Sequence, residues 1–182
     1  MAMDDCKFRE YIEELLKKEV RVEVTADGVV HLIKHPFDES IPLGELRKIA
    51  RSWAKNRYKV PNPKKPGSTI PTTQKNLDKR HDIEISPGGI GHTVRDAEDV
   101  FTLYSLSALP QMIEHMKRVG IEPPSEEWKM KEPRALRAER YEVKVKIGEN
   151  TYMAHFLIRV SKKGVKQTAR MKKVEYYNHY VK

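Results

Sequence analysis

The chain has few of the features that stabilise secreted proteins or anchor membrane proteins. It contains one cysteine, Cys6, so an intramolecular disulfide and a zinc site made of four cysteines are both excluded. No apolar run is long enough to cross a bilayer, and residues 1–10 lack the apolar segment of a secretion signal. These absences predict a cytoplasmic protein, of the producing or the target cell, that does not contact a membrane.

Sequence signatures of nucleotide-binding and hydrolytic enzymes are missing as well. There is no Walker loop, dinucleotide fingerprint or serine nucleophile elbow, and the glycine-rich residues 88–91 are too short and poorly placed to form one. The seven histidines are not accompanied by acidic or cysteine clusters at the spacing of metal ligands. We therefore expect neither a metal nor a cofactor, and group transfer from a dinucleotide has no signature here.

The chain is rich in positive charge, and this charge is unevenly distributed. Lysine and arginine number 35 against 26 acidic residues, a formal charge of +9. Residues 140–182 carry 11 basic and 3 acidic side chains and residues 61–80 carry 5 and 1, whereas residues 81–139 carry 7 and 11. Such asymmetry favours a polyanionic partner, nucleic acid before membrane. The alternative is a basic surface that serves solubility alone.

The apolar pattern divides the chain into three parts. Residues 1–60 predict a helix, a β-hairpin around the turn at 25–28, and a second helix that ends near Tyr58. Residues 61–76 contain four prolines and predict a linker or an extended arm. We therefore predict an N-terminal α+β accessory unit over residues 1–60, a linker over 61–76 and a larger domain over 77–182.

Alternation dominates the end of the larger domain. A short strand at residues 82–86 precedes a glycine turn and helical patterns that reach Met116, and residues 141–147, 151–160 and 174–181 then alternate as strands. Three consecutive antiparallel strands behind helices are typical of an α+β domain. The predicted fold class is thus α+β, with helices packed on a small antiparallel sheet and an N-terminal helix–hairpin–helix unit.

His92 is the most distinctive candidate for chemistry. Cleavage of RNA without metal needs a base for the 2′-hydroxyl, an acid for the leaving oxygen and a cation for the phosphorane charge. His92 follows the glycine-rich turn at the predicted start of a helix, where an anion can approach the backbone, and Thr93 and Arg95 lie next to it. The alternative is a histidine that only caps the helix.

A second group of candidates lies on the C-terminal strands. His155 and Arg159 are four residues apart in one strand and share a face, and Tyr177 and His179 can lie on that face too if the strands pair as a meander. Residues 162 and 163 are lysines at the start of a basic loop. The alternative is that this face is merely the polar outer side of a half-buried sheet.

The order of several segments resembles a known class of nucleases. The stretches DIEISPGGIGHT, SALPQMIEHM, YEVKVKIGENTYMAHFLIRV and VEYYNHYV follow one another over about residues 81–182. In this order they resemble the phage and polymorphic-toxin nuclease domains of the barnase–EndoU–colicin–RelE (BECR) class. Asn178 stands where the terminal motif of that class usually has an acid, and residues 1–60 resemble no family that we can name.

This resemblance implies a metal-independent endoribonuclease, a toxin that cleaves tRNA or other cellular RNA and that has an immunity protein or antitoxin as a partner. It implies that His92 and His179 act as acid and base, in either order. From placement we expect Arg159, or else a lysine of the Lys162–Lys163 loop, to stabilise the transition state. The predicted RNA-binding residues are Thr93, Arg95, His155, Lys162, Lys163 and Tyr177. The alternative function is a non-catalytic nucleic-acid-binding protein or a phage structural accessory protein.

Overall fold

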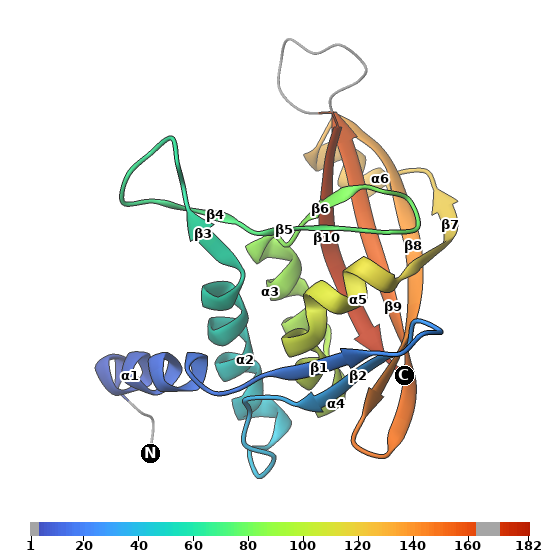
Figure 1. The fold of residues 1–182 in the computed structure, drawn as a ribbon. Coiled ribbons are helices and arrows are strands. Elements are labelled where there is room, and N and C mark those ends of the chain that lie inside the picture. Colours follow the sequence, from blue (N-terminus) through green and yellow to red (C-terminus); the bar gives the residue numbers. More distant parts are fainter. Residues whose placement is uncertain (1–3, 163–171) are drawn as a thin grey trace.

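The computed structural model describes residues 4–162 and 172–182, and one curled eight-stranded sheet dominates it (Figure 1). The strand order is β1-β2-β8-β9-β10-β6-β5, and β7 pairs with residues 138–142 of β8. The strands of this sheet are β1 (Arg21–Val24), β2 (Val30–Lys34), β5 (Thr73–Lys75), β6 (Asp82–Glu84), β7 (Lys117–Glu122), β8 (Ala135–Ile147), β9 (Asn150–Lys162) and β10 (Lys172–Val181).

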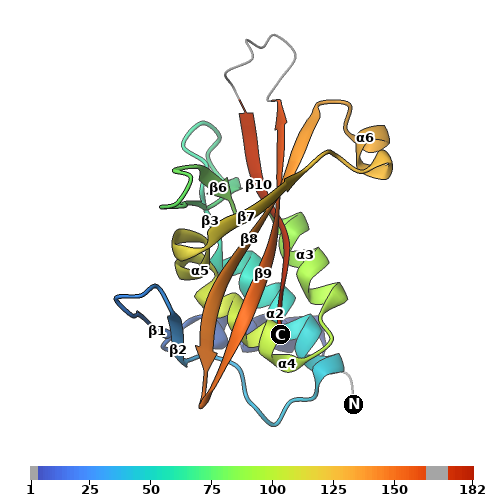
Figure 2. The ribbon, with the colours of Figure 1, turned by 90° about the vertical axis from the view of Figure 1, so that its right-hand side faces the viewer.

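Most helices lie on one side of this sheet, whereas α6 projects from its far end near β7 and β8 (Figure 2). The helices are α1 (Asp5–Leu16), α2 (Leu43–Arg57), α3 (Pro87–Asp96), α4 (Val100–Ser105), α5 (Leu109–His115) and α6 (Glu126–Lys131), with a 3₁₀ turn at Leu106–Ala108. None of the helices within residues 4–162 and 172–182 is both long and apolar enough to cross a membrane.

The two N-terminal helices form because their apolar residues recur at helical spacing. The Asp4 carboxylate caps α1 by accepting a hydrogen bond of 2.8 Å from the Lys7 amide, and Ile12 and Leu15 are buried one turn apart. In α2, Leu46 and Trp53 lie two turns apart and are both buried. These two helices match the sequence prediction in number and type.

The sheet is larger than predicted and mixed in direction, so the prediction of helices on a small antiparallel sheet is wrong. The β8–β9–β10 meander is antiparallel, but β2 pairs with β8 in parallel, from Val30 with Val145 to Leu32 with Ile147, and β6 pairs in parallel with β10. The alternating pattern identified strands but not their partners. The strand predicted at residues 82–86 is β6, whereas β5, which has only three residues, and β7 were not predicted.

The N-terminal segment is part of the same sheet and the same core. Its hairpin extends the sheet beyond β8, and Ile12 and Trp53 belong to one buried cluster with Phe156 and Tyr176. The proline-rich stretch at 61–76 contains β4 (Thr69–Pro71), which pairs with β3 (Lys59–Pro61), and all of β5. The predicted boundary between residues 1–60 and 77–182 therefore crosses a continuous sheet and core.

Helix α3 is fastened to β10 at a point where only glycine fits. The glycine-rich segment is not a turn, as the sequence suggested, because the helix begins at Pro87 and Ser86 caps it by accepting a hydrogen bond of 3.0 Å from the Gly89 amide. A Cβ atom on Gly89 would overlap the carbonyl oxygen of Tyr176 and lie 2.8 Å from its ring carbon Cδ1. The glycine thus permits close packing of the helix on the strand.

We expect Gly89→Ala to destabilise the fold by about 1–3 kcal/mol because the helix must move away from β10. Gly91→Ala is the matched control, since nothing lies within 4 Å of a Cβ there and alanine favours a helix by up to about 1 kcal/mol. Urea unfolding of both variants measures the difference. Equal stability of the two would contradict the close packing.

Candidate nucleic-acid site

Helix α3 places His92 against the outer side of β10. The His92 ring lies 4.4 Å from the Tyr177 ring, measured between centroids. The Arg159 guanidinium lies 3.6 Å from the centre of the Tyr177 ring and 4.5 Å from that of Trp128, which comes from α6. We call His92, Tyr177, Arg159 and Trp128 the His92 group. The structure therefore brings together two of the three predicted catalytic residues, with Tyr177 between them.

The electrostatic surroundings keep the His92 imidazole neutral. Partial burial, followed by the nearby guanidinium groups of Arg95 and Arg159, lowers the pKa of His92 below its ordinary value. Its Nδ1 atom is buried and meets no hydrogen-bond partner within the described residues. A neutral imidazole beside cations combines a proton acceptor with groups that attract phosphate.

His179, the other predicted acid–base residue, lies in the core. Only 2% of it is exposed, and its ring stacks on Phe156 at 4.8 Å. Both ring nitrogens are engaged, Nε2 with the Ser105 hydroxyl at 2.7 Å and Nδ1 with the Tyr176 hydroxyl at 2.8 Å. Burial lowers the pKa of His179 to about 3. The geometry thus suits a neutral structural histidine, and the predicted pair of exposed imidazoles is not formed.

The predicted RNA-binding residues are scattered. Thr93 is buried, hydrogen-bonds the Tyr176 hydroxyl and accepts a hydrogen bond of 3.1 Å from the His179 amide. Arg95 is exposed and pairs with Asp96 at 2.8 Å. His155 stacks on Tyr180 at 4.7 Å and pairs with Glu142 at 3.4 Å. Lys162 is exposed at the end of β9, and Lys163 lies outside the described residues.

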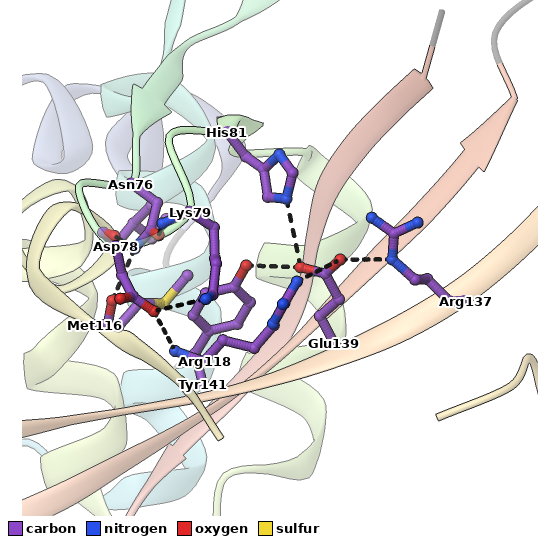
Figure 3. Close-up of polar contacts among 10 residues, drawn as sticks. Asn76, Asp78, Lys79, His81, Met116, Arg118, Arg137, Glu139 and Tyr141 are labelled. Carbon is purple, nitrogen blue, oxygen red and sulfur yellow. Dashed lines mark hydrogen bonds and ion pairs between the residues drawn. The ribbon is translucent and has the colours of Figure 1, made fainter. Parts of the chain in front are cut away.

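A second polar cluster was missed by the sequence analysis, and it surrounds the buried carboxylate of Glu139 (Figure 3). Glu139 Oε1 accepts a hydrogen bond of 2.6 Å from Tyr141 and lies 3.6 Å from His81 Nε2. Its Oε2 accepts from Arg137 Nε at 2.7 Å and lies 3.5 Å from Arg118. We call these five residues the Glu139 group.

The sequence does contain a sign of the Glu139 group: charged residues interrupt the alternation of apolar residues in β8. Arg137, Glu139 and Tyr141 are alternate residues of β8 and lie on its inner face together with Val143. The predicted strand began at Tyr141 and therefore omitted both charged residues. Trp128 was also missed as a site residue, since one aromatic residue in a charged segment carries no periodic signal.

Comparison with known families gives one match, which covers residues 42–180. The chain belongs to the large polyvalent protein-associated domain 3 family. The match begins at α2 and includes both the His92 group and the Glu139 group, whereas α1 and the first hairpin precede it. No curated protein and no solved structure matches the chain. The resemblance to BECR nucleases stays a prediction for this member of the family.

We expect the buried, neutral His179 to make this domain less stable in mild acid. The unfolded chain takes up a proton near pH 6.5, whereas the folded histidine does so only near pH 3, so stability is present above pH 6.5 and is lost as the pH falls toward 3. Between pH 6.5 and 5 this loss amounts to about 2 kcal/mol. Urea unfolding at both pH values measures it. The same loss in His179→Gln would show that His179 is not the cause.

Proposed function

We propose that this domain is a metal-independent endoribonuclease whose general base is His92. The observation that carries the proposal is the contact of a neutral imidazole with Tyr177, whose ring also holds the Arg159 guanidinium. The His92 group thus combines a base, His92, a phenol, Tyr177, and a permanent cation, Arg159. Cleavage of RNA by its own 2′-hydroxyl requires these three kinds of group.

In the proposed reaction, His92 takes the proton of a ribose 2′-hydroxyl. The 2′-oxygen forms a bond to the adjacent phosphorus, and the bond from phosphorus to the 5′-oxygen of the next nucleotide breaks. Arg159 stabilises the charge that builds up on the non-bridging oxygens, because a guanidinium stays protonated at any physiological pH. Tyr177 would protonate the leaving oxygen, which leaves a 2′,3′-cyclic phosphate and a free 5′-hydroxyl. His179 has no part in the proton transfer and acts as a positioning residue beneath Tyr176.

The biological setting that we propose is a toxin associated with phage-related polyvalent proteins. The family name connects the domain with large polyvalent proteins, and the resemblance of residues 81–182 to BECR domains adds tRNA or other cellular RNA as the target. A protein of this kind requires an immunity protein or antitoxin in the cell that makes it.

A non-catalytic nucleic-acid-binding role is the second candidate, and the stacking of Arg159 favours it. Its guanidinium is held between Trp128 and Tyr177, an arrangement that also serves simply to pack α6 on the sheet. A chain with this role binds RNA with a steep dependence on salt but never cuts it. The cleavage assay below separates the two roles.

We expect the chain to cleave single-stranded RNA in the presence of a chelator, and His92→Ala to slow cleavage by about 10²–10⁴-fold, the usual contribution of a general base. His115→Ala is the control, because His115 is the last residue of α5, pairs with Glu114 at 3.8 Å and belongs neither to the His92 group nor to the Glu139 group. Electrophoresis of end-labelled RNA measures the rates, and circular dichroism verifies folding. Full activity of folded His92→Ala would overturn the assignment of the base.

The pH dependence of cleavage tests the same residue in a second way. Because His92 must be neutral and its pKa is lowered, kcat/KM should rise with pH and then level off, with the midpoint of the rise below pH 6.5. Arg159→Gln removes one cation that lowers this pKa, so the rising limb should move to higher pH as the rate falls. Arg140→Gln is the control, since Arg140 pairs with Glu122 at 2.9 Å. An unmoved limb in Arg159→Gln would exclude His92 as the titrating base.

A further inference from the structure

The Glu139 group lies on the opposite side of the sheet from Arg159. Ala138 of β8 is paired with Arg159 of β9, so these two residues share a face, and the adjacent Glu139 points to the other face. That face is the one that carries the core residues Phe156 and Tyr176. The Glu139 group is therefore a separate feature at the edge of the core and takes no part in the chemistry proposed for His92.

The turn that precedes β6 is built to hold His81 in this group. Asn76 is fully buried, and its side-chain amide donates hydrogen bonds of 2.8 Å to the carbonyls of Ile113 and Met116. The backbone amide of Asn76 donates a hydrogen bond of 2.8 Å to the His81 carbonyl, which closes the turn. Arg80, next to His81, has a φ of 55°, the one positive φ of a non-glycine residue in the described ranges. A non-glycine residue in this region is strained, and such strain persists only where the surrounding structure fixes the conformation.

The charges of the group do not balance. Burial is the largest influence on the Glu139 carboxyl and raises its pKa, but the hydrogen bonds from Tyr141 and Arg137 and the nearby cations together lower the pKa below its ordinary value. Glu139 is therefore an anion at neutral pH, and it faces two guanidinium groups. Asp78 accepts from the backbone amide of Arg118 at 3.0 Å and is paired with Lys79 at 4.0 Å. One positive charge is left over even when His81 is neutral.

The surplus cations have donors directed toward solvent. The Arg118, Arg137 and His81 side chains are 24%, 25% and 26% exposed, whereas the Glu139 side chain is fully buried beneath them. Within the described residues, the Arg137 side chain donates only through Nε, and that of Arg118 makes no hydrogen bond within ordinary distance. Within the described residues, each guanidinium therefore has N–H groups that Glu139 does not engage, and such groups can bind two oxygens of a phosphate.

We propose that Arg118, Arg137 and His81 form a phosphate-binding site whose geometry is fixed by Glu139. The ligand is the phosphate group of a nucleotide, either a terminal monoester or a backbone diester. A purely structural role explains the cluster less well, because replacing a buried ion pair with apolar residues is often neutral or stabilising. The site does not rest on the ribonuclease proposal, since phosphate binding requires no cleavage.

The test is calorimetric titration of the full chain with inorganic phosphate. We expect saturable binding that Arg118→Gln and Arg137→Gln each weaken by about tenfold or more, because each variant removes a charged donor. Arg140→Gln is the matched control, since this variant also removes one positive charge. Arg140 lies on β8, as Arg137 does, but its side chain is on the opposite face of the sheet from the Glu139 group. Equal affinity of the Arg118 and Arg140 variants, or no saturable binding by the unaltered chain, would overturn the proposal.

Arg137→Gln leaves the buried Glu139 short of a partner and can unfold the chain for that reason alone. The double variant Arg137→Gln with Glu139→Gln removes both charges, and we expect it to fold but to bind phosphate about tenfold more weakly. Unchanged affinity of this variant would also contradict the site. His92→Ala should bind phosphate normally, so failure of the ribonuclease proposal and failure of the phosphate site are distinguishable.

Two short 2′-O-methyl RNAs of the same sequence, one with and one without a 5′-phosphate, distinguish a terminal monoester from a backbone diester. Neither RNA can be cleaved through its 2′-oxygens. Tighter binding of the RNA that carries a 5′-phosphate, lost in Arg118→Gln, shows recognition of a terminal monoester. Equal binding of both RNAs, again lost in Arg118→Gln, shows recognition of the backbone diester. Binding of both RNAs that Arg118→Gln leaves unchanged would show that RNA does not use this site.

Discussion

The fold and its candidate site depend on one irregularity in β10, the bulge at Tyr177. Tyr176 pairs with Ile158 and Asn178 with Leu157, so one residue of β10 has no partner on β9. Without the bulge, residues 177 and 179 would point to the same side of the sheet. With it, Tyr176 and His179 both face the core, and Tyr177, which lies between them in the sequence, is outside beside His92. Separation of the two predicted catalytic histidines is a direct result of this extra residue.

The same segment of β10 determines where α3 lies. The Ser86 hydroxyl donates a hydrogen bond of 3.0 Å to the Tyr176 carbonyl, and Gly89 lets the helix approach that carbonyl closely. His92 is one turn further along the helix than Gly89, and it therefore reaches the Tyr177 ring. The glycine-rich sequence thus serves packing and not ligand approach. It still fixes the position of the candidate base, by bringing helix and strand together.

How far the sequence predicts this arrangement varies from residue to residue. His92 and Arg159 were predicted together because each stands out in a local pattern, a glycine run and a polar strand face, and both patterns persist in the fold. His179 was placed on the wrong side, since a bulge leaves no mark in an alternating sequence. The parallel pairing of Val30 with Val145 depends on a contact across more than half of the chain, which no local pattern reports. The long strands β8 to β10 and the short strand β6 show alternation and were predicted, whereas the three-residue strand β5 is too short to show it.

Two buried ionisable residues show why one polar cluster is inert and the other is a site for a ligand. His179 is neutral, and its two hydrogen bonds, to Ser105 and Tyr176, satisfy both ring nitrogens. Glu139 remains charged, and a charged carboxylate without water requires cations around it. These cations are arginines, and each has more donors than one carboxylate can accept. Burial of the glutamate therefore forces unsatisfied cationic donors toward the surface, where a phosphate can complete them.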